Sequence, residues 1–327
     1  MNNEMDWIRE ITPQHKHQTD LQVGIGDDAA VYHLSADYET VVCVDTMVEE
    51  VHFKKQTMPL QAVGYKALSA NISDLAAMGA IPLYYLVSII IPKTGWSKSD
   101  LKEIYEGMKK LGDEHKMDLI GGDTVSTKEM LAITVTVIGK LEKGRRLLRS
   151  QAQPGDTLFT TGNLGSSAYG LEKLLAQGLK CAGQKEIAPY IQAHQYPEPQ
   201  VKAGRILAES GFRIALNDIS DGLASEAKEI AVASNAAVHI EWDKIPKAKL
   251  IGQSAQERQE NWVLYGGEDY QLVGTVSPKH WESLVKEFEK ESLSIYKIGF
   301  ISEGKGEVFL LKNGNTFPIR KTGYDHL

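Results

Sequence analysis

The 327-residue chain contains only two cysteines, Cys43 and Cys181. Two cysteines are too few for a disulfide framework, and their spacing does not fit a set of metal ligands. Long hydrophobic runs are missing as well: the longest, residues 81–91, includes Pro82 and is too short to span a bilayer, so we expect a buried strand there. The N-terminal segment MNNEMDWIREITPQ is acidic and lacks the apolar core of a signal peptide. These absences predict a cytoplasmic protein without membrane association.

Two common nucleotide-binding signatures are also absent from the sequence. The nearest approach to a P-loop runs from Gly139 to Gly144 and continues with Arg145-Arg146 instead of Lys-Ser/Thr. A Gly-x-Gly-x-x-Gly turn followed by a distal acid, as in dinucleotide-binding folds, does not occur either. The sequence therefore excludes both of these nucleotide-binding classes.

Positive charge is in the minority, with 36 Lys and Arg against 43 Asp and Glu and a net charge of −7. This balance argues against nucleic acid as a partner, because nucleic-acid binding normally requires a basic face. A length of 327 residues exceeds the size at which one core stops growing, so we expect two domains. The polar segment KGRRLLRSQAQPGD places the boundary near residue 150, which gives domains of residues 1–150 and 151–327.

Strands and helices are predicted to alternate along the chain, as in a mixed α/β (α+β) protein. In the first half we expect strands at 41–44, 83–91, 119–120 and 131–138, helices at about 60–78 and from 99, and turns at Asp45 and Gly121-Gly122-Asp123. In the second half we expect strands at 157–161 and 213–216, helices to 177, from 199 to 211 and after NDISDG, and two strands flanking LYGGEDYQL.

Seven aspartates stand out because each lies in a predicted short turn or helix rich in small residues. They are Asp27, Asp28, Asp45, Asp74, Asp123, Asp218 and Asp221. Grouped carboxylates repel one another unless protons or cations neutralise them. Hard divalent ions take oxygen ligands, and Mg2+ on phosphates is the usual biological use of such a group. We therefore expect these acids to meet at a magnesium site.

Each acidic motif also has a purely structural interpretation. GIGDDAAV and IGGDT are typical of solvated hairpin turns as well, and Ser220 or Asp221 in NDISDG has the composition of a helix N-cap. Asp74 shares a helix face with Ala67 and Ala70 near the predicted C-terminal end, where the macrodipole disfavours a negative charge. That placement favours a cation beside Asp74.

Several other candidate residues carry a less specific signal. TGNLGSSAYG has the strand–loop–helix layout of a phosphate-binding turn, although close packing of helix against strand explains its glycines equally well. Arg145, Arg146 and Arg149 form a basic cluster that suits phosphate oxygens or a solvated linker. His52 is a candidate for contact with a phosphate or substrate, and Tyr105 lies on an apolar helix stripe that indicates a core position.

Six segments in order, GIGDD, VDTMVEEVHF, NISDLAAMGA, IGGDT, DISDG and YGGEDYQL, give the chain its strongest signal. Together they resemble the thiamine-monophosphate kinase family, from about residue 20 to the C-terminal GYDHL. The wider superfamily includes aminoimidazole ribonucleotide synthetase, selenophosphate synthetase and a hydrogenase maturation factor. The resemblance implies a two-domain, synthetase-like architecture and a homodimer whose N-terminal domains join their sheets.

The resemblance also implies transfer of the γ-phosphoryl group of ATP to thiamine monophosphate, which yields thiamine diphosphate and ADP. It assigns several Mg2+ ions to Asp28, Asp45, Asp74, Asp123, Asp218 and Asp221. It assigns nucleotide contacts to Tyr105, Gly122, Asp123, Arg149 and Ser220. It assigns contacts with thiamine monophosphate to His52, Glu268 and Tyr324, where a tyrosine ring beside the cationic thiazolium gains about 1 kcal/mol.

One departure from the family pattern affects the metal site before Asp45. Family members often carry hydroxyl residues there, whereas this chain has Cys43 and Val44. Val44 offers only its carbonyl, and a thiol is a poor Mg2+ ligand. We expect this metal position to be weaker or completed by water.

The expected chemistry needs no general base, because an acceptor phosphate is already ionised. Metal ions neutralise the two polyphosphates and align the acceptor oxygen with the γ-phosphorus. The sequence therefore predicts direct in-line transfer without a phosphorylated enzyme and without catalytic side chains of the acid–base kind.

Two other functions remain open. A sibling synthetase is disfavoured because Cys43 lies within a strand and the chain ends Tyr324-Asp325-His326-Leu327 without a cysteine. The second is a non-catalytic protein that binds a nucleotide or divalent ions.

Overall fold

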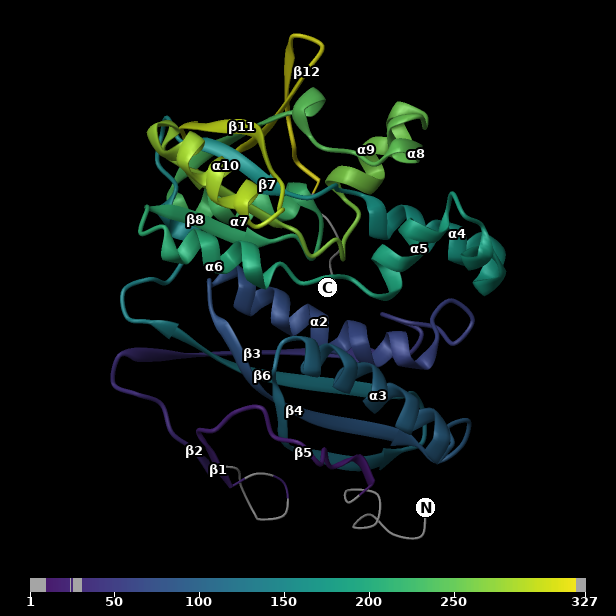
Figure 1. Cartoon of the computed structure of the whole chain (residues 1–327). Coiled ribbons are helices and arrows are strands. Elements are labelled where there is room, and N and C mark those ends of the chain that lie inside the picture. Colours follow the sequence, from purple (N-terminus) through teal and green to yellow (C-terminus); the bar gives the residue numbers. More distant parts are fainter. Residues whose placement is uncertain (1–9, 24, 26–30, 322–327) are drawn as a thin grey trace. The chain divides into compact units, whose positions relative to one another are not determined.

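The computed structural model describes residues 10–23, 25 and 31–321, which form two compact units (Figure 1). Unit 1 contains Met1–Leu75, Ile81–Lys143 and Gly178–Lys180, and unit 2 contains Ala76–Ala80, Gly144–Gln177 and Cys181–Leu327. Each unit combines a sheet with helices, so the predicted mixed α/β class is confirmed. The domain limits 1–150 and 151–327 stay a prediction about independently folding parts.

Unit 1 is built on a four-stranded sheet in the order β3-β6-β4-β5 (Figure 1). The strands are β3 (Tyr38–Val48), β4 (Ile81–Pro92), β5 (Asp118–Thr127) and β6 (Ala132–Glu142). Along β6, fully buried residues alternate with half-buried ones. This period of two arises because successive side chains of a strand point to opposite faces, of which only one is fully covered. A separate pair, β1 (Leu21–Val23) and β2 (Val31–Tyr32), is antiparallel.

Two helices of unit 1, α2 (Leu60–Ala77) and α3 (Lys98–Glu114), agree with the predicted helices. A capping box begins α3: the Ser97 side chain accepts a bond from the Asp100 N–H, and the Asp100 carboxylate accepts one from the Ser97 N–H. The helices approach closely where glycines face backbone. A Cβ at Gly64 would lie 1.8 Å from the Ile104 carbonyl oxygen, and one at Gly107 would lie 1.9 Å from that of Gln61.

Two predicted turns of unit 1 are wrong. Asp45 lies within β3, and Gly121-Gly122-Asp123 lies within β5 rather than in a turn between strands. A Cβ at Gly122 would stand 2.0 Å from the Val87 carbonyl oxygen of neighbouring β4. Gly122 therefore allows close strand pairing, which could not be seen from the turn-like Gly-Gly-Asp sequence.

Unit 2 contains a seven-stranded sheet in the order β13-β12-β9-β11-β7-β10-β8. Its strands are β7 (Thr157–Thr161), β8 (Ile214–Asp218), β9 (Ala236–Glu241), β10 (Leu272–Val276), β11 (Ile295–Glu303), β12 (Val308–Lys312) and β13 (Asn315–Pro318). All pairs are antiparallel except β9 with β12. The predicted strands at 157–161 and 213–216 are thus present as β7 and β8.

The helices of unit 2 are α4 (Ser166–Gln177), α5 (Ala188–Gln195), α6 (Val201–Glu209), α7 (Leu223–Ser234), α8 (Lys249–Gly252), α9 (Gln256–Leu264) and α10 (Trp281–Lys290). The short 3-10 turns of unit 2 are η1 (Arg149–Gln151), η3 (Trp242–Lys244) and η4 (Pro278–His280), and a further turn, η2 (Gly178–Gly183), belongs to unit 1 up to Lys180 and to unit 2 from Cys181. One prediction is wrong here: LYGGEDYQL is preceded by α9 and followed by β10, not flanked by two strands. The amphipathic pattern of α9 is weak, with only Trp262, Val263 and Leu264 buried, so its period was hard to detect.

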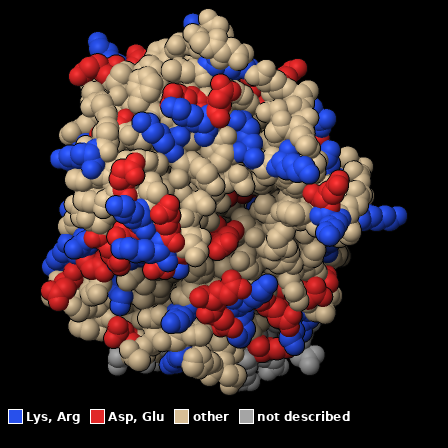
Figure 2. All heavy atoms as spheres, turned by 45° about the horizontal axis from the view of Figure 1, so that its top comes forward, with Lys and Arg blue, Asp and Glu red and all other residues tan. Residues whose placement is uncertain are grey.

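The surface carries mixed charge. On the face shown in Figure 2, Lys and Arg side chains are interspersed with Asp and Glu side chains. In the described part of the chain, no helix has the length and apolar character needed to cross a membrane.

We predict that Gly107→Ala lowers the free energy of unfolding by about 3 kcal/mol, because the added methyl group collides with the backbone of α2. Urea denaturation measures the change. Gly252→Ala is the matched control, since a Cβ at that helical position meets no described atom within 4 Å. Equal stability of the two variants would contradict the close helix packing.

Candidate active site

The acidic residues of unit 1 are divided between the two edge strands of its sheet. Asp45 belongs to β3 and Asp123 to β5, and both side chains are exposed. Three strand spacings separate these edges, or about 14 Å. Carboxylate oxygens bound to one Mg2+ lie only about 3 Å apart. Asp45 and Asp123 of one chain are therefore too far apart to share an ion.

Asp74 lies in the last turn of α2, as predicted, and is half-buried. One turn earlier, the Asn71 carbonyl accepts a hydrogen bond of 3.3 Å from Cys43 Sγ in β3. This bond places the Asn71 turn of α2 against the strand that carries Cys43, Val44 and Asp45. The Val44 side chain is 58% exposed, whereas the Cys43 thiol points toward the backbone of α2.

The His52 ring is fixed by the loop that follows β3. Its Nδ1 accepts a hydrogen bond of 3.0 Å from the Val48 N–H. A nitrogen that accepts cannot carry the proton, so the neutral ring has its proton on Nε2 and presents a donor there. Glu49 secures the same loop, since its carboxylate accepts bonds of 3.1 Å each from Trp96 Nε1 and the Leu131 N–H.

Two predicted nucleotide contacts of unit 1 differ in exposure. Tyr105 is buried in the α3 stripe, at 8% exposure, as expected for a core residue. Burial also raises the pKa of its hydroxyl above the ordinary value. Gly122 in β5 is exposed.

In unit 2, the NDISDG and GGEDY segments are joined along their backbones. The Glu268 N–H donates to the Ser220 carbonyl at 2.6 Å, and the Tyr270 N–H donates to the Ile219 carbonyl at 2.9 Å. A Cβ at Gly267 would stand 2.4 Å from the Ser220 carbonyl oxygen. Glycine therefore permits the approach, and the predicted site residues of both segments are brought together.

A chain of side-chain hydrogen bonds connects Arg149 to the NDISDG segment. Arg149 Nε donates to Asn217 Oδ1 at 2.9 Å, and Asn217 Nδ2 donates to the carboxylate of Glu226 in α7. The other Glu226 oxygen accepts from the Asp221 N–H at 3.2 Å and from Ser220 Oγ at 3.4 Å. Arg149, Ser220 and Asp221, which were singled out separately in the sequence, thus belong to one network.

Glu226 is a site residue that sequence reasoning missed. It is 4% exposed, next to Asp218, which is 3% exposed. Burial, together with the charges of Asp218 and Asp221, raises the pKa of Glu226 to about 8. Glu226 lies in the first turn of α7, close to Asp218 in sequence, and this spacing was the one available signal. The signal was weak, because acidic residues are common at the start of helices. The N-cap of α7 is Gly222, so neither Ser220 nor Asp221 acts as the cap.

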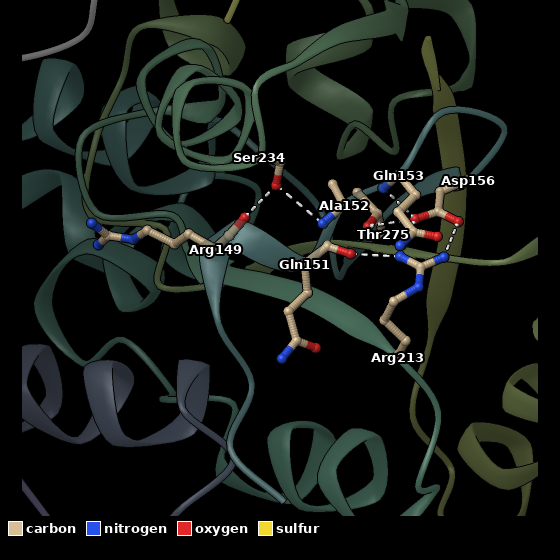
Figure 3. Close-up of polar contacts among 8 residues, drawn as sticks. All are labelled: Arg149, Gln151, Ala152, Gln153, Asp156, Arg213, Ser234 and Thr275. Carbon is tan, nitrogen blue, oxygen red and sulfur yellow. Dashed lines mark hydrogen bonds and ion pairs between the residues drawn. The ribbon is translucent and has the colours of Figure 1, made fainter. Parts of the chain in front are cut away.

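The 3-10 turn that carries Arg149 is anchored at both ends (Figure 3). Ser234 Oγ donates to the Arg149 carbonyl at 2.8 Å and accepts from the Ala152 N–H at 3.0 Å. At the other end, Arg213 donates to the Gln151 carbonyl. These bonds hold the backbone of η1, and in Figure 3 the Arg149 side chain extends away from them.

Asp156 holds Arg213 in place with a bidentate ion pair (Figure 3). The Arg213 guanidinium donates to the two Asp156 oxygens at 2.7 and 2.8 Å. The Gln153 N–H and Thr275 Oγ1 donate to the same carboxylate, at 2.9 and 3.4 Å. Asp156 is 2% exposed, so its charge depends on these donors.

The start of α4 is capped by Asp269, a second residue that sequence reasoning missed. Its carboxylate accepts from the Gly165 N–H at 2.6 Å and from the Ser167 N–H at 3.0 Å. Burial raises the pKa of Asp269 to about 7, and these backbone donors oppose the shift. The phosphate-binding interpretation of TGNLGSSAYG is wrong for these N–H groups, because a carboxylate of the chain already occupies them. A Cβ at Gly165 would stand 3.0 Å from Val263, which supports the packing interpretation.

Glu268, expected to contact thiamine monophosphate, has an unusual backbone. Its φ is +66°, in the left-handed region that is strained for a residue with a side chain. Its carboxylate is 27% exposed and lies 3.4 Å from Nδ1 of buried His194. Strained residues concentrate at functional sites, which agrees with a role for Glu268 in binding.

The predicted aspartate ligands suit magnesium better than a metal ion that takes three or more ligands from the protein. Among the described residues, no three His, Cys, Asp or Glu side chains form a metal-binding group by themselves. Mg2+ usually takes one or two carboxylates and fills its remaining positions with water and substrate phosphates. Asp218 with Asp221 in unit 2, and separately the aspartates of unit 1, carry hard oxygen atoms that would suit such an ion. Asp27, Asp28 and Tyr324 lie outside the described residues.

Comparison with known proteins defines the class of the chain. Residues 26–141 match the family model "AIR synthase related protein, N-terminal domain", and residues 153–312 match the corresponding C-terminal domain. The chain is therefore a two-domain AIR synthase related protein.

Closer relatives define the family. The chain is 47% identical over 325 residues to thiamine-monophosphate kinase of Bacillus subtilis, covering 99% of each protein. A crystal structure of thiamine-monophosphate kinase from Stenotrophomonas maltophilia is 32% identical and superimposes with a TM-score of 0.83, covering 95% of this chain and 96% of that one. A structure of AaThiL complexed with AMPPCP and TMP is 29% identical, with a TM-score of 0.78 and coverage of 93% and 92%. The chain belongs to the thiamine-monophosphate kinase family, and the predicted resemblance is confirmed.

We predict that Arg213→Met lowers the free energy of unfolding by about 2 kcal/mol, because it leaves the buried Asp156 charge without its guanidinium partner. Chemical denaturation measures the change. Lys244→Met, which breaks an exposed ion pair with Glu241, is the control and should change stability by less than about 0.5 kcal/mol. Similar losses in both variants would argue against the anchoring role of Arg213.

Proposed function

We propose that the protein transfers the γ-phosphoryl group of ATP to thiamine monophosphate, forming thiamine diphosphate and ADP. The main support is the full-length similarity to thiamine-monophosphate kinases. A related structure holds AMPPCP and TMP, an ATP analogue and a ligand of the kind that the reaction requires. The hydrogen-bonded network of Arg149, Ser220 and Asp221 in unit 2 suits the binding of a polyphosphate.

Magnesium ions are part of the proposal. The proposed ligands are Asp45, Asp74 and Asp123 in unit 1, Asp218 and Asp221 in unit 2, and Asp28, with Cys43 and Val44 contributing little. Mg2+ would supply the charge neutralisation that lets two polyphosphate anions approach each other.

The side chains of the protein bind and orient the reactants in this reaction. Arg149 offers its guanidinium to phosphate oxygens. The backbone of η1 is fixed at both ends, and Arg149 Nε is held by Asn217. His52 offers a donor on Nε2, and Glu268 offers a carboxylate. The acceptor phosphate is ionised at neutral pH, so the transfer proceeds in line without a general base and without a phosphorylated side chain.

We also propose a homodimer in which the sheets of two copies of unit 1 join. The edge strands β3 and β5 are the sites for such pairing, since an edge presents unpaired backbone groups. Val42, Val44 and Val125 on these strands are 59%, 58% and 41% exposed in the single chain. Edge-to-edge pairing would set β3 of one copy beside β5 of its partner, and so bring Asp45 and Asp123 of different copies near each other.

We also propose a cytoplasmic location, which agrees with the two free cysteines, Cys43 and Cys181.

For the dimer, we predict that Val42→Lys converts the protein to a monomer, because a charge replaces an apolar side chain in the joined sheet. Sedimentation velocity measures the mass. Leu175→Lys is the control, since Leu175 is 60% exposed in α4 of unit 2. A Val42→Lys protein that stays dimeric would exclude β3 from the interface.

For the reaction, we predict that Asp123→Asn reduces turnover by at least about 100-fold while the fold is retained, because it removes a proposed metal ligand at an exposed position. The assay is ADP release with and without thiamine monophosphate in Mg2+ buffer, with EDTA as the metal-free arm. Asp37→Asn, an exposed acid of the same unit, is the control. Wild-type turnover in Asp123→Asn would refute its assignment.

The same assay separates the alternatives. Release of ADP only with another acceptor would identify a sibling synthetase. Binding of ATP without any turnover would identify a non-catalytic nucleotide-binding protein.

A further inference from the structure

Four polar residues of unit 2, Ser167, His194, Glu268 and Asp269, lie next to one another, and three of them are buried. Asp269 accepts from the Ser167 N–H at 3.0 Å, and Ser167 Oγ lies 3.1 Å from His194 Nδ1. The same Nδ1 lies 3.4 Å from Oε2 of Glu268, the residue that precedes Asp269 in the sequence. The His194 side chain is 2% exposed and Ser167 is fully buried. The proposed reaction uses only Glu268 of these four.

The Glu268 carboxylate determines which nitrogen of the His194 ring carries a proton. A carboxylate oxygen has only lone pairs, so it faces Nδ1 favourably only when that nitrogen bears hydrogen. Nδ1–H then donates to the Ser167 hydroxyl oxygen and also lies close to the Glu268 carboxylate, whose Oε2 is 3.4 Å from the nitrogen. Ser167 is itself held through its N–H by Asp269, so the orientation of the imidazole is fixed by the start of α4.

We propose that His194 is a positioning residue that holds the Glu268 carboxylate in its binding orientation before the acceptor arrives. A glutamate side chain has three rotatable bonds, and fixing one oxygen in advance removes part of the ordering cost of binding. The backbone strain at Glu268, with φ of +66° and its N–H bonded to the Ser220 carbonyl, fixes the other end of the residue. The inference rests on the proposed function, because it takes Glu268 to contact thiamine monophosphate.

The first test compares two amide substitutions of His194. The amide nitrogen of His194→Asn falls near the position of Nδ1, whereas that of His194→Gln falls near Nε2. We expect His194→Gln to raise the KM for thiamine monophosphate about 10-fold, with the KM for ATP unchanged, and His194→Asn to restore most of the loss. A merely structural role would change both KM values or reduce the two variants alike, and that result overturns the inference.

Ser167→Ala is a second, smaller change for the case in which the His194 variants do not fold. It removes the hydroxyl that orients the ring and should raise only the KM for thiamine monophosphate. An unchanged KM in this variant overturns the inference.

Glu268→Gln distinguishes failure of the inference from failure of the proposed function. If His194 acts through Glu268, the double variant His194→Gln/Glu268→Gln has the same acceptor KM as Glu268→Gln alone. If Glu268→Gln raises the acceptor KM and His194→Gln does not, the inference fails and the proposed function stands. If Glu268→Gln leaves it unchanged, the inference fails together with the acceptor role of Glu268, while phosphorylation of thiamine monophosphate stands.

An activity-free measurement tests the contact itself. In 15N-labelled protein, Glu268→Gln should shift the Nδ1 resonance of His194, whereas the exposed control Glu282→Gln should not. A resonance that is insensitive to Glu268→Gln overturns the inference even if the protein has no kinase activity.

Discussion

Backbone hydrogen bonds between the NDISDG and GGEDY segments are the constraint on which the polar site of unit 2 depends. The bonds from Glu268 to Ser220 and from Tyr270 to Ile219 leave no room for a side chain at Gly267. These bonds hold the two backbones together, so Asp218 and Ser220 lie in the same region as Glu268 although the two segments are far apart in sequence. The side-chain network through Glu226 and the capping of α4 by Asp269 are then built around this junction.

Charge is the second organising factor. Asp156 shows the stable solution for a buried carboxylate: a bidentate arginine and further donors satisfy it completely. Glu226 shows the other case, since its neighbours include Asp218 and Asp221 and its pKa rises to about 8. A like-charged group of this kind is unfavourable in the absence of a cation or protons. The contrast separates an acid of unit 2 that is fully paired within the chain from a group of acids that lie close to one another.

Much of the fold was readable from the sequence. Richness in Ala and Leu with a stop at Gly79 located α2, an apolar stripe located α3, and a long apolar run located β4. Gly121-Gly122 and Asp45 were assigned to turns because glycine and aspartate are typical turn residues; in fact Gly122 makes room for the carbonyl of Val87 in a neighbouring strand. That neighbour is distant in sequence, so local pattern could not reveal it. Of the candidate site, the sequence motifs singled out Arg149, Ser220 and Asp221, and the family resemblance added Glu268. Glu226, Asp269 and His194 were not singled out, because their contacts with these segments are made only after folding.

The capped start of α4 has a consequence for selectivity among anions. A helix N-terminus left open is a general receptor for phosphate, sulfate or carboxylate ions in the surrounding medium. Here the buried carboxylate of Asp269, which is tethered to the chain, occupies that receptor. An inorganic phosphate ion would have to displace a carboxylate that is covalently linked to the chain, so this glycine-rich loop is a poor receptor for free anions.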